Sequence, residues 1–182
     1  GTIAIGSSAL NALTSGAPNI AIGYQAGTLQ TTGHKNVSIG YQAFSTAADG
    51  ESSNICIGYQ AGSDMVAGGC DHNVIIGDSA GTGGGAAMAS CIAIGSNAMN
   101  STVANAETGT IAIGHDSLTA LTSGARNLAV GYQALEDMTV GYDNIAIGYL
   151  ALNGLTTDAN ADKNIAIGNY VMDVASNTAS TA

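Results

Sequence analysis

A short pattern of polar and apolar positions recurs ten times along this chain of 182 residues. A polar residue is followed by a branched apolar residue, a small residue, a second branched apolar residue and a glycine, as in Asn-Ile-Ala-Ile-Gly at 19–23. Successive closing glycines are 17 to 20 residues apart: Gly6, Gly23, Gly40, Gly58, Gly77, Gly95, Gly114, Gly131, Gly148 and Gly168. Self-similarity at this period predicts a solenoid, in which each repeat forms one coil stacked on the next.

Alternation inside the motif predicts a short strand, with both branched residues on one side and the small residue on the other. We expect the branched pair to point into the core, and the small residue, such as Ala21, to face a neighbouring chain. The Tyr-Gln-Ala segments that follow several glycines, as at 24–26, predict a second short strand. The next apolar residue, such as Leu10 or Phe44, is expected to enter the same core as the branched pair. A polar turn then leads to the next coil.

The leading polar position of the motif is asparagine in most copies. When coils stack in register, identical residues form columns, and an amide can donate to one layer while it accepts from another. We therefore expect a structural asparagine ladder made of Asn19, Asn36, Asn54, Asn73, Asn127, Asn144 and Asn164.

Residues 126–135, Arg-Asn-Leu-Ala-Val-Gly-Tyr-Gln-Ala-Leu, are the fullest copy of the repeat. In these residues the chain resembles the head repeat of trimeric autotransporter adhesins and similar repeats of bacteriophage tail fibres. The resemblance implies an all-β fold, a left-handed parallel β-roll (a β-solenoid) packed as a homotrimer. The glycine spacing predicts about ten coils of 17–20 residues, which are longer than the usual coils of the adhesin heads. We expect residues 1–182 to form a single solenoid segment that is a fragment of a longer fibre.

Charge and hydropathy exclude several classes of partner. The formal net charge is −10, with only three Lys and Arg residues, whereas nucleic-acid binding needs clustered cations. Apolar runs are far shorter than the roughly 20 residues that span a bilayer, so we expect no membrane insertion of this segment. Neither a cofactor motif nor a metal-ligand spacing is recognisable in the sequence, and we expect neither group.

One set of residues is a candidate for ligand binding. Stacked tyrosines beside glutamines could hold the sugar rings of a cell-surface glycan or receptor, whereas the alternative is a ladder that serves stacking alone. These tyrosines are Tyr24, Tyr41, Tyr59, Tyr132 and Tyr149. The thirteen carboxylates lie in turns and do not pair as a hydrolase requires, so we expect no catalytic residues and no enzymatic activity.

Together these features predict a non-enzymatic structural and adhesive segment of an extracellular trimeric fibre. A bacteriophage tail fibre that contributes to host-surface attachment is the leading interpretation. A bacterial surface adhesin head or a secreted extracellular filament is the first alternative, which would place the chain on the bacterial cell surface. A polysaccharide-degrading tail spike is a second alternative, which the sequence favours less.

Overall fold

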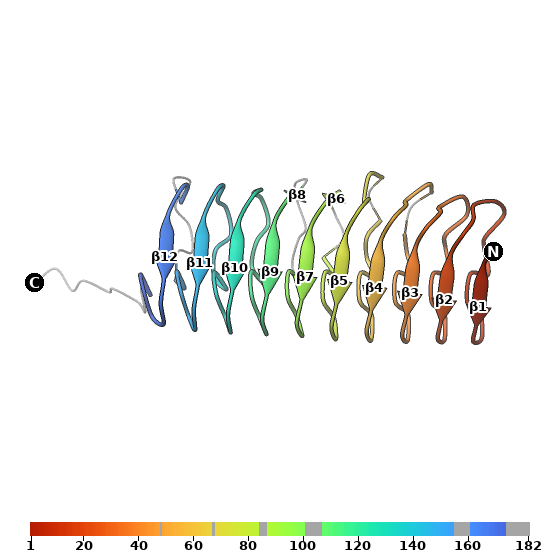
Figure 1. Cartoon of the computed structure of the whole chain (residues 1–182), viewed down its shortest axis with the longest axis horizontal. Coiled ribbons are helices and arrows are strands. Elements are labelled where there is room, and N and C mark those ends of the chain that lie inside the picture. Colours follow the sequence, from red (N-terminus) through yellow and green to blue (C-terminus); the bar gives the residue numbers. More distant parts are fainter. Residues whose placement is uncertain (48, 67, 84–86, 101–106, 155–160, 174–182) are drawn as a thin grey trace, which may run out of the picture.

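The computed structural model describes residues 1–47, 49–66, 68–83, 87–100, 107–154 and 161–173. These residues are all-β, and their parallel strands stack along one axis as a β-solenoid (Figure 1). The predicted solenoid is therefore confirmed. Within the described ranges, no helix has the length and apolar character needed to cross a membrane.

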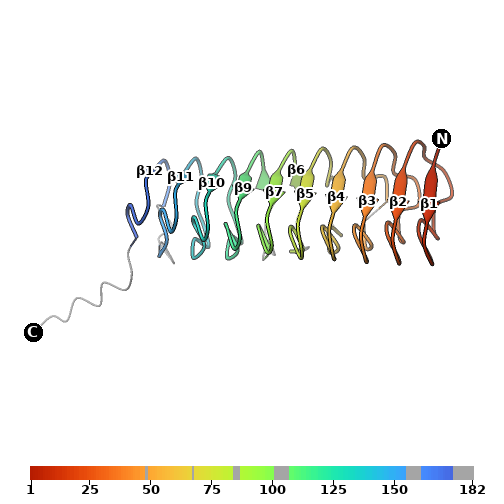
Figure 2. The same cartoon turned by 60° about the horizontal axis from the view of Figure 1, so that its bottom comes forward.

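One ten-stranded parallel sheet runs the length of the rod, and both views show its strands side by side (Figures 1 and 2). Its strands are β1 (Ile3–Ile5), β2 (Ile20–Ile22), β3 (Val37–Ile39), β4 (Ile55–Ile57), β5 (Val74–Ile76), β7 (Ile92–Ile94), β9 (Ile111–Ile113), β10 (Leu128–Val130), β11 (Ile145–Ile147) and β12 (Ile165–Ile167). A smaller parallel pair joins β6 (Met88–Ala89) to β8 (Glu107–Thr108). Like positions pair between strands, as in Ala21 opposite Ser38 and Ser38 opposite Cys56.

The strands face the opposite way from the prediction. From β2 to β12 of the long sheet, the middle residue of each strand is completely buried, and in every strand except β5 it is small, as at Ala21, Ala93 and Ala146. The branched residues on either side are half-buried or exposed, and Ile55 and Ile113 keep 37% and 36% of their surface. The expectation that the branched pair fills the core and that the small residue meets another chain is therefore wrong.

Volume explains this orientation. Four places after five of the ten closing glycines stands a fully buried apolar residue, such as Phe44 or Leu118, which fills the coil from the other side. A coil this thin leaves room for only a small residue opposite it. The coil of β5 has the opposite arrangement, because Gly81 stands at the fourth place and the large Ile75 occupies the middle of the strand. A Cβ on Gly81 would lie 3.1 Å from Ile75 Cδ1.

The segment after each glycine is a turn and contains no strand, so the predicted second strand is also wrong. Its second and fourth residues adopt left-handed backbone conformations, for example Gln42 at φ 53° and Phe44 at φ 52°. Such conformations cost roughly 1 kcal/mol for residues other than glycine. Hydrogen bonds between coils offset this cost, since Gln42 N donates to Tyr24 O and Phe44 N donates to Ala61 O, at 2.8 and 2.9 Å.

The closing glycines form a column in which no side chain fits. Gly131 has φ 139°, and a Cβ there would lie 2.2 Å from the carbonyl oxygen of Gly148 in the next coil. Each strand therefore ends in a corner that brings successive backbones together more closely than any other residue allows.

Candidate functional site

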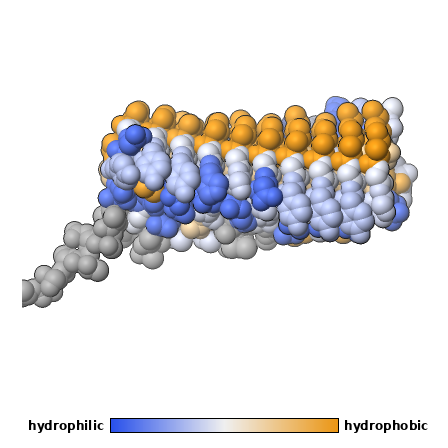
Figure 3. All heavy atoms as spheres, turned by 90° about the horizontal axis from the view of Figure 1, so that it is seen from below, coloured by the Kyte–Doolittle hydropathy of each residue, from blue (hydrophilic) through white to orange (hydrophobic). Residues whose placement is uncertain are grey.

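The outward branched residues of the long sheet form a continuous apolar strip, which we call the isoleucine face. Figure 3 shows this strip running along one side of the rod. Its members are Ile3, Ile5, Ile20, Ile22, Val37, Ile39, Ile55, Ile57, Val74, Ile76, Ile92, Ile94, Ile111, Ile113, Leu128, Val130, Ile145, Ile147, Ile165 and Ile167. A contiguous apolar patch of this extent is typical of an interaction surface.

The five tyrosines singled out in the sequence lie in two separate stacks. Tyr24, Tyr41 and Tyr59 form the first, with successive ring centroids 5.2 Å apart and nearly parallel planes. In the second, the rings of Tyr132 and Tyr149 are 5.3 Å apart. All five residues remain 39–48% exposed, so their ring edges are available to a ligand.

Two short residues separate the stacks. Backbone hydrogen bonds fix the column, because Ser79 N donates to Tyr59 O, Asn97 N to Asp78 O and Asp116 N to Ser96 O. Asp78 and Ser96 therefore occupy the two positions between the aromatic stacks. His115 resumes the column and stacks on Tyr132 with centroids 5.2 Å apart. Its place immediately after Gly114 is the sequence signal that assigns it to this column.

The asparagines predicted as a ladder lie next to the buried start of each strand. Asn36 N donates to Asn19 Oδ1 and Asn54 N donates to Asn36 Oδ1, both at 2.9 Å. The side-chain amides also donate to turn carbonyls of the following coil, as Asn54 Nδ2 does to Cys70 O at 2.7 Å. The same arrangement joins Asn127, Asn144 and Asn164 near the other end. These side chains serve to satisfy buried backbone groups, which is a structural role.

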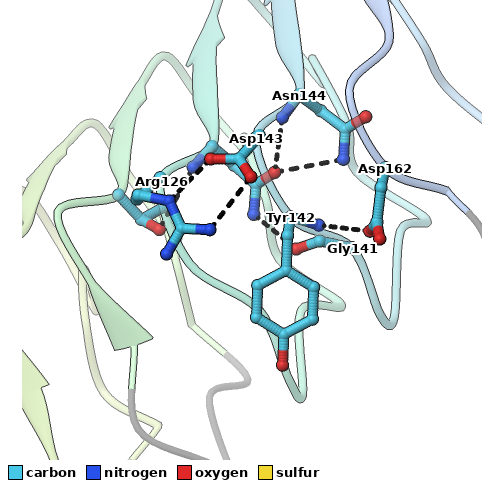
Figure 4. A network of polar contacts seen from close by, with 8 residues as sticks. Arg126, Gly141, Tyr142, Asp143, Asn144 and Asp162 are labelled. Atoms are coloured by element: carbon cyan, nitrogen blue, oxygen red, sulfur yellow. Dashed lines mark hydrogen bonds and ion pairs between the residues drawn. The ribbon is translucent and has the colours of Figure 1, made fainter.

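An ion pair joins two neighbouring turns next to this second part of the ladder. Arg126 donates from Nε to Asp143 Oδ1 at 2.6 Å and from Nη2 to Asp143 Oδ2 at 2.9 Å (Figure 4). These hydrogen bonds lower the pKa of Asp143 and raise the pKa of Arg126. Tyr142, which precedes Asp143 in the same turn, donates from its backbone N to Asp162 Oδ1 of the following turn at 2.8 Å. These contacts connect successive surface turns to one another.

Glu51 is the most unusual titratable group in the described part of the chain. Its residue is only 2% exposed, Oε1 accepts a 3.4 Å hydrogen bond from Cys70 N, and Oε2 has no partner among the described residues. Burial raises its pKa to about 7, with a smaller contribution from the charge of Asp71. Burial likewise raises the pKa of Cys70 to about 12, so its thiol stays protonated.

A polar groove runs across the turns that carry Tyr41 and Tyr59. It is a hollow of about 430 Å³ lined by Gln42, Ser45, Thr46, Gln60, Ser63, Asp64, Ser79, Thr82 and Asn100. The groove was not predicted from the sequence. Its signal is the run of small hydroxyl residues five places after the glycines, at Ser45, Ser63 and Thr82.

His, Cys, Asp and Glu are the side chains that could bind a metal ion in the described part of the chain. No group of three or more His, Cys, Asp or Glu among them could hold a metal ion. His115 Nδ1 lies 2.8 Å from Asp116 Oδ2, but its ring is part of the aromatic stack. No protein-family model matches the chain, and no curated protein or solved structure proved similar to it. The surfaces that remain are the isoleucine face, the tyrosine stacks and the polar groove.

Proposed function

We propose that this chain is a non-enzymatic structural segment of a trimeric extracellular fibre, in the manner of a bacteriophage tail fibre that contributes to host-surface attachment. In this proposal the glycine spacing sets about ten coils of 17–20 residues, and the coils wind as a left-handed β-roll, as the sequence resemblance implies. The unbroken isoleucine face carries the proposal, because a long apolar strip on a thin rod needs a cover of equal length.

Other copies of the same chain supply such a cover. A parallel neighbour in register presents an identical strip, so apolar rungs meet apolar rungs along the whole length. Three copies around one axis let each strip contact both others and withdraw it from water. The tyrosine stacks lie beside the strip (Figure 3), at the rim of such a bundle, where their exposed edges remain accessible.

The mass of the purified chain in solution tests this proposal. A single chain has a mass of 17.8 kDa, so a trimer has about 53 kDa, three times that value. Sedimentation equilibrium or light scattering coupled to size exclusion measures it directly. A mass of one or two chains at micromolar concentration contradicts the trimer.

A further inference from the structure

The polar groove separates two columns of side chains that run along the rod. One wall holds the second residues after the closing glycines, Gln42, Gln60 and Ser79. The opposite wall holds the fifth residues, Ser45, Ser63, Thr82 and Asn100, and Thr46 and Asp64 extend it. The groove therefore crosses the turns that follow β3, β4, β5 and β7 and lies parallel to the long axis.

The same two columns are bridged further along the chain. Asn100 Nδ2 donates to Asn97 Oδ1 at 3.2 Å, and Gln133 Nε2 donates to Glu136 Oε1 at 2.9 Å. In the turns after β3, β4 and β5 the fifth residue is a serine or threonine, too short to reach across. The hollow thus follows from small residues at these positions.

The groove offers hydrogen-bonding groups that the described residues leave unused. Gln42 Nε2 donates to Gln25 Oε1 and Gln60 Nε2 to Gln42 Oε1, at 2.8 and 3.0 Å. This amide ladder ends at Ser79, and among the described residues nothing donates to Gln60 Oε1. The side-chain hydroxyls of Ser45, Ser63 and Ser79 likewise make no hydrogen bond within the described part of the chain. Neighbouring coils repeat such groups about every 5 Å, the spacing of the adjacent tyrosine rings.

The chemistry of the lining selects among ligands. No lysine or arginine lines the groove in the described residues, and Asp64 together with the net charge of −10 disfavours phosphate, sulfate or uronate groups. All nine lining residues are polar, so an apolar peptide side chain would gain little there. Sugar hydroxyls both donate and accept, which matches serine and threonine hydroxyls and glutamine amides.

We propose that this polar groove binds a neutral glycan chain that lies along the rod, with its hydroxyls hydrogen-bonded to the two side-chain columns. The inference rests on the proposed attachment function and names the class of ligand that the fibre would recognise. It locates recognition in the groove and leaves the tyrosine stacks to stiffen the rod.

Side-chain amide signals in nitrogen–proton correlation spectra of the whole chain test the proposal. Maltohexaose and a linear mannohexaose serve as neutral probes, and a hyaluronan hexasaccharide serves as the anionic comparison. We expect at least one neutral probe to shift the amide signals of Gln42 and Gln60. The amide of Gln133, which is engaged with Glu136 outside the groove, is the internal control and should stay in place.

A double variant closes the groove in the way that the chain itself closes it elsewhere. Ser45→Gln with Ser63→Gln should weaken binding of the neutral probe about tenfold or more, because the new amides occupy the ligand's hydrogen-bonding positions. Thr119→Gln places a glutamine at the same repeat position outside the groove and should leave affinity unchanged. If the double variant does not fold, the amide shifts of the native chain still test whether the groove binds the neutral probes.

The proposal of a glycan-binding groove is wrong if neither neutral probe shifts the amide signals, or if hyaluronan binds equally well. It is also wrong if the shifts are confined to the rings of Tyr41 and Tyr59, or if the folded double variant keeps full affinity. The mass measurement is independent of these. A trimeric chain without a groove response loses only the glycan site, and a monomeric chain that binds in the groove loses only the trimeric fibre.

Discussion

Individual glycines decide whether one coil can rest on the next. Gly131 has a backbone conformation that side chains rarely adopt, and a Cβ there would meet the Gly148 carbonyl. Gly131→Ala should therefore lower the free energy of unfolding by more than about 3 kcal/mol, through strain and a backbone clash together. Chemical denaturation followed by far-ultraviolet circular dichroism measures this change.

Gly68→Ala is the matched control for that substitution. A Cβ at Gly68 meets nothing within 4 Å, and its φ lies outside the left-handed range. The variant should have a free energy of unfolding within about 0.5 kcal/mol of the native chain. If both variants lost the same free energy of unfolding, the close backbone contact at Gly131 would not be what makes a side chain costly there.

Glu51 makes stability depend on pH. Its pKa is about 7 in the folded chain and near 4.5 when unfolded, so folding takes up a proton between these values. The contribution of Glu51 to the free energy of unfolding falls as pH rises through that window. Above about pH 7 the carboxylate is charged in the folded chain, and the full cost of burying that charge is present. Glu51→Gln should then raise stability at pH 8 by about 1–3 kcal/mol and change it little at pH 4.

Unfolding curves at both pH values measure the effect of Glu51→Gln. Asp137→Asn removes a carboxylate from a surface turn and is the control, because its stability difference should be small at both pH values. If the Glu51→Gln variant kept the pH profile of the native chain, the carboxyl of Glu51 would be hydrated in solution rather than desolvated.

At the scale of one coil, the strand and the turn share a fixed interior volume. Ile75 is large where Gly81 is small, whereas Ala112 is small where Leu118 is large, and the side chains of Ile75, Ala112 and Leu118 are fully buried. The backbone does not forbid the exchange, since Gly81 has φ 56° and Leu118 φ 52°. In these two coils the sizes of the two residues are therefore complementary. In the coils of β2 and β4 both places are small, and the side chains of Gln30 and Met65 fill the space instead, 2.9 Å from where a Cβ of Gly27 or Gly62 would lie.

A double-mutant cycle tests this pairing. Ile75→Ala should cost about 2–4 kcal/mol of stability through the cavity that it leaves. Gly81→Leu alone should overpack the coil, since even a Cβ there lies 3.1 Å from Ile75. The two substitutions together place alanine in the strand and leucine in the turn, as Ala112 and Leu118 do in the β9 coil. We expect the free energy of unfolding of the double variant, measured with denaturant, to lie within about 1 kcal/mol of the native value. Additive losses would contradict the shared volume.

At the scale of the whole molecule, the isoleucine face is an apolar surface that a single chain leaves exposed to water. In the proposed trimer, lysine at Ile55 and Ile113 would place charges in the apolar contact. The Ile55→Lys and Ile113→Lys double variant should sediment as one chain of 17.8 kDa while keeping the native circular dichroism spectrum. Leu29→Lys alters a turn residue that is 52% exposed away from the strands and should leave the mass unchanged. Loss of assembly in both variants, or in neither, contradicts the assignment of this face.

The sequence by itself determined the stacked architecture, because the spacing of its glycines and the repetition of Asn-Ile-Ala-Ile leave no periodic alternative. It also identified the two residue sets that form the tyrosine stacks and the asparagine ladder. Alternation along a strand defines two faces but does not say which one is inside when both are apolar. That choice required the volume supplied by the opposite wall, where Phe44 and Leu118 leave room only for Ser38 and Ala112. The polar groove was likewise decided by tertiary structure, since its walls are columns assembled from separate coils and its opening depends on which side chains reach across.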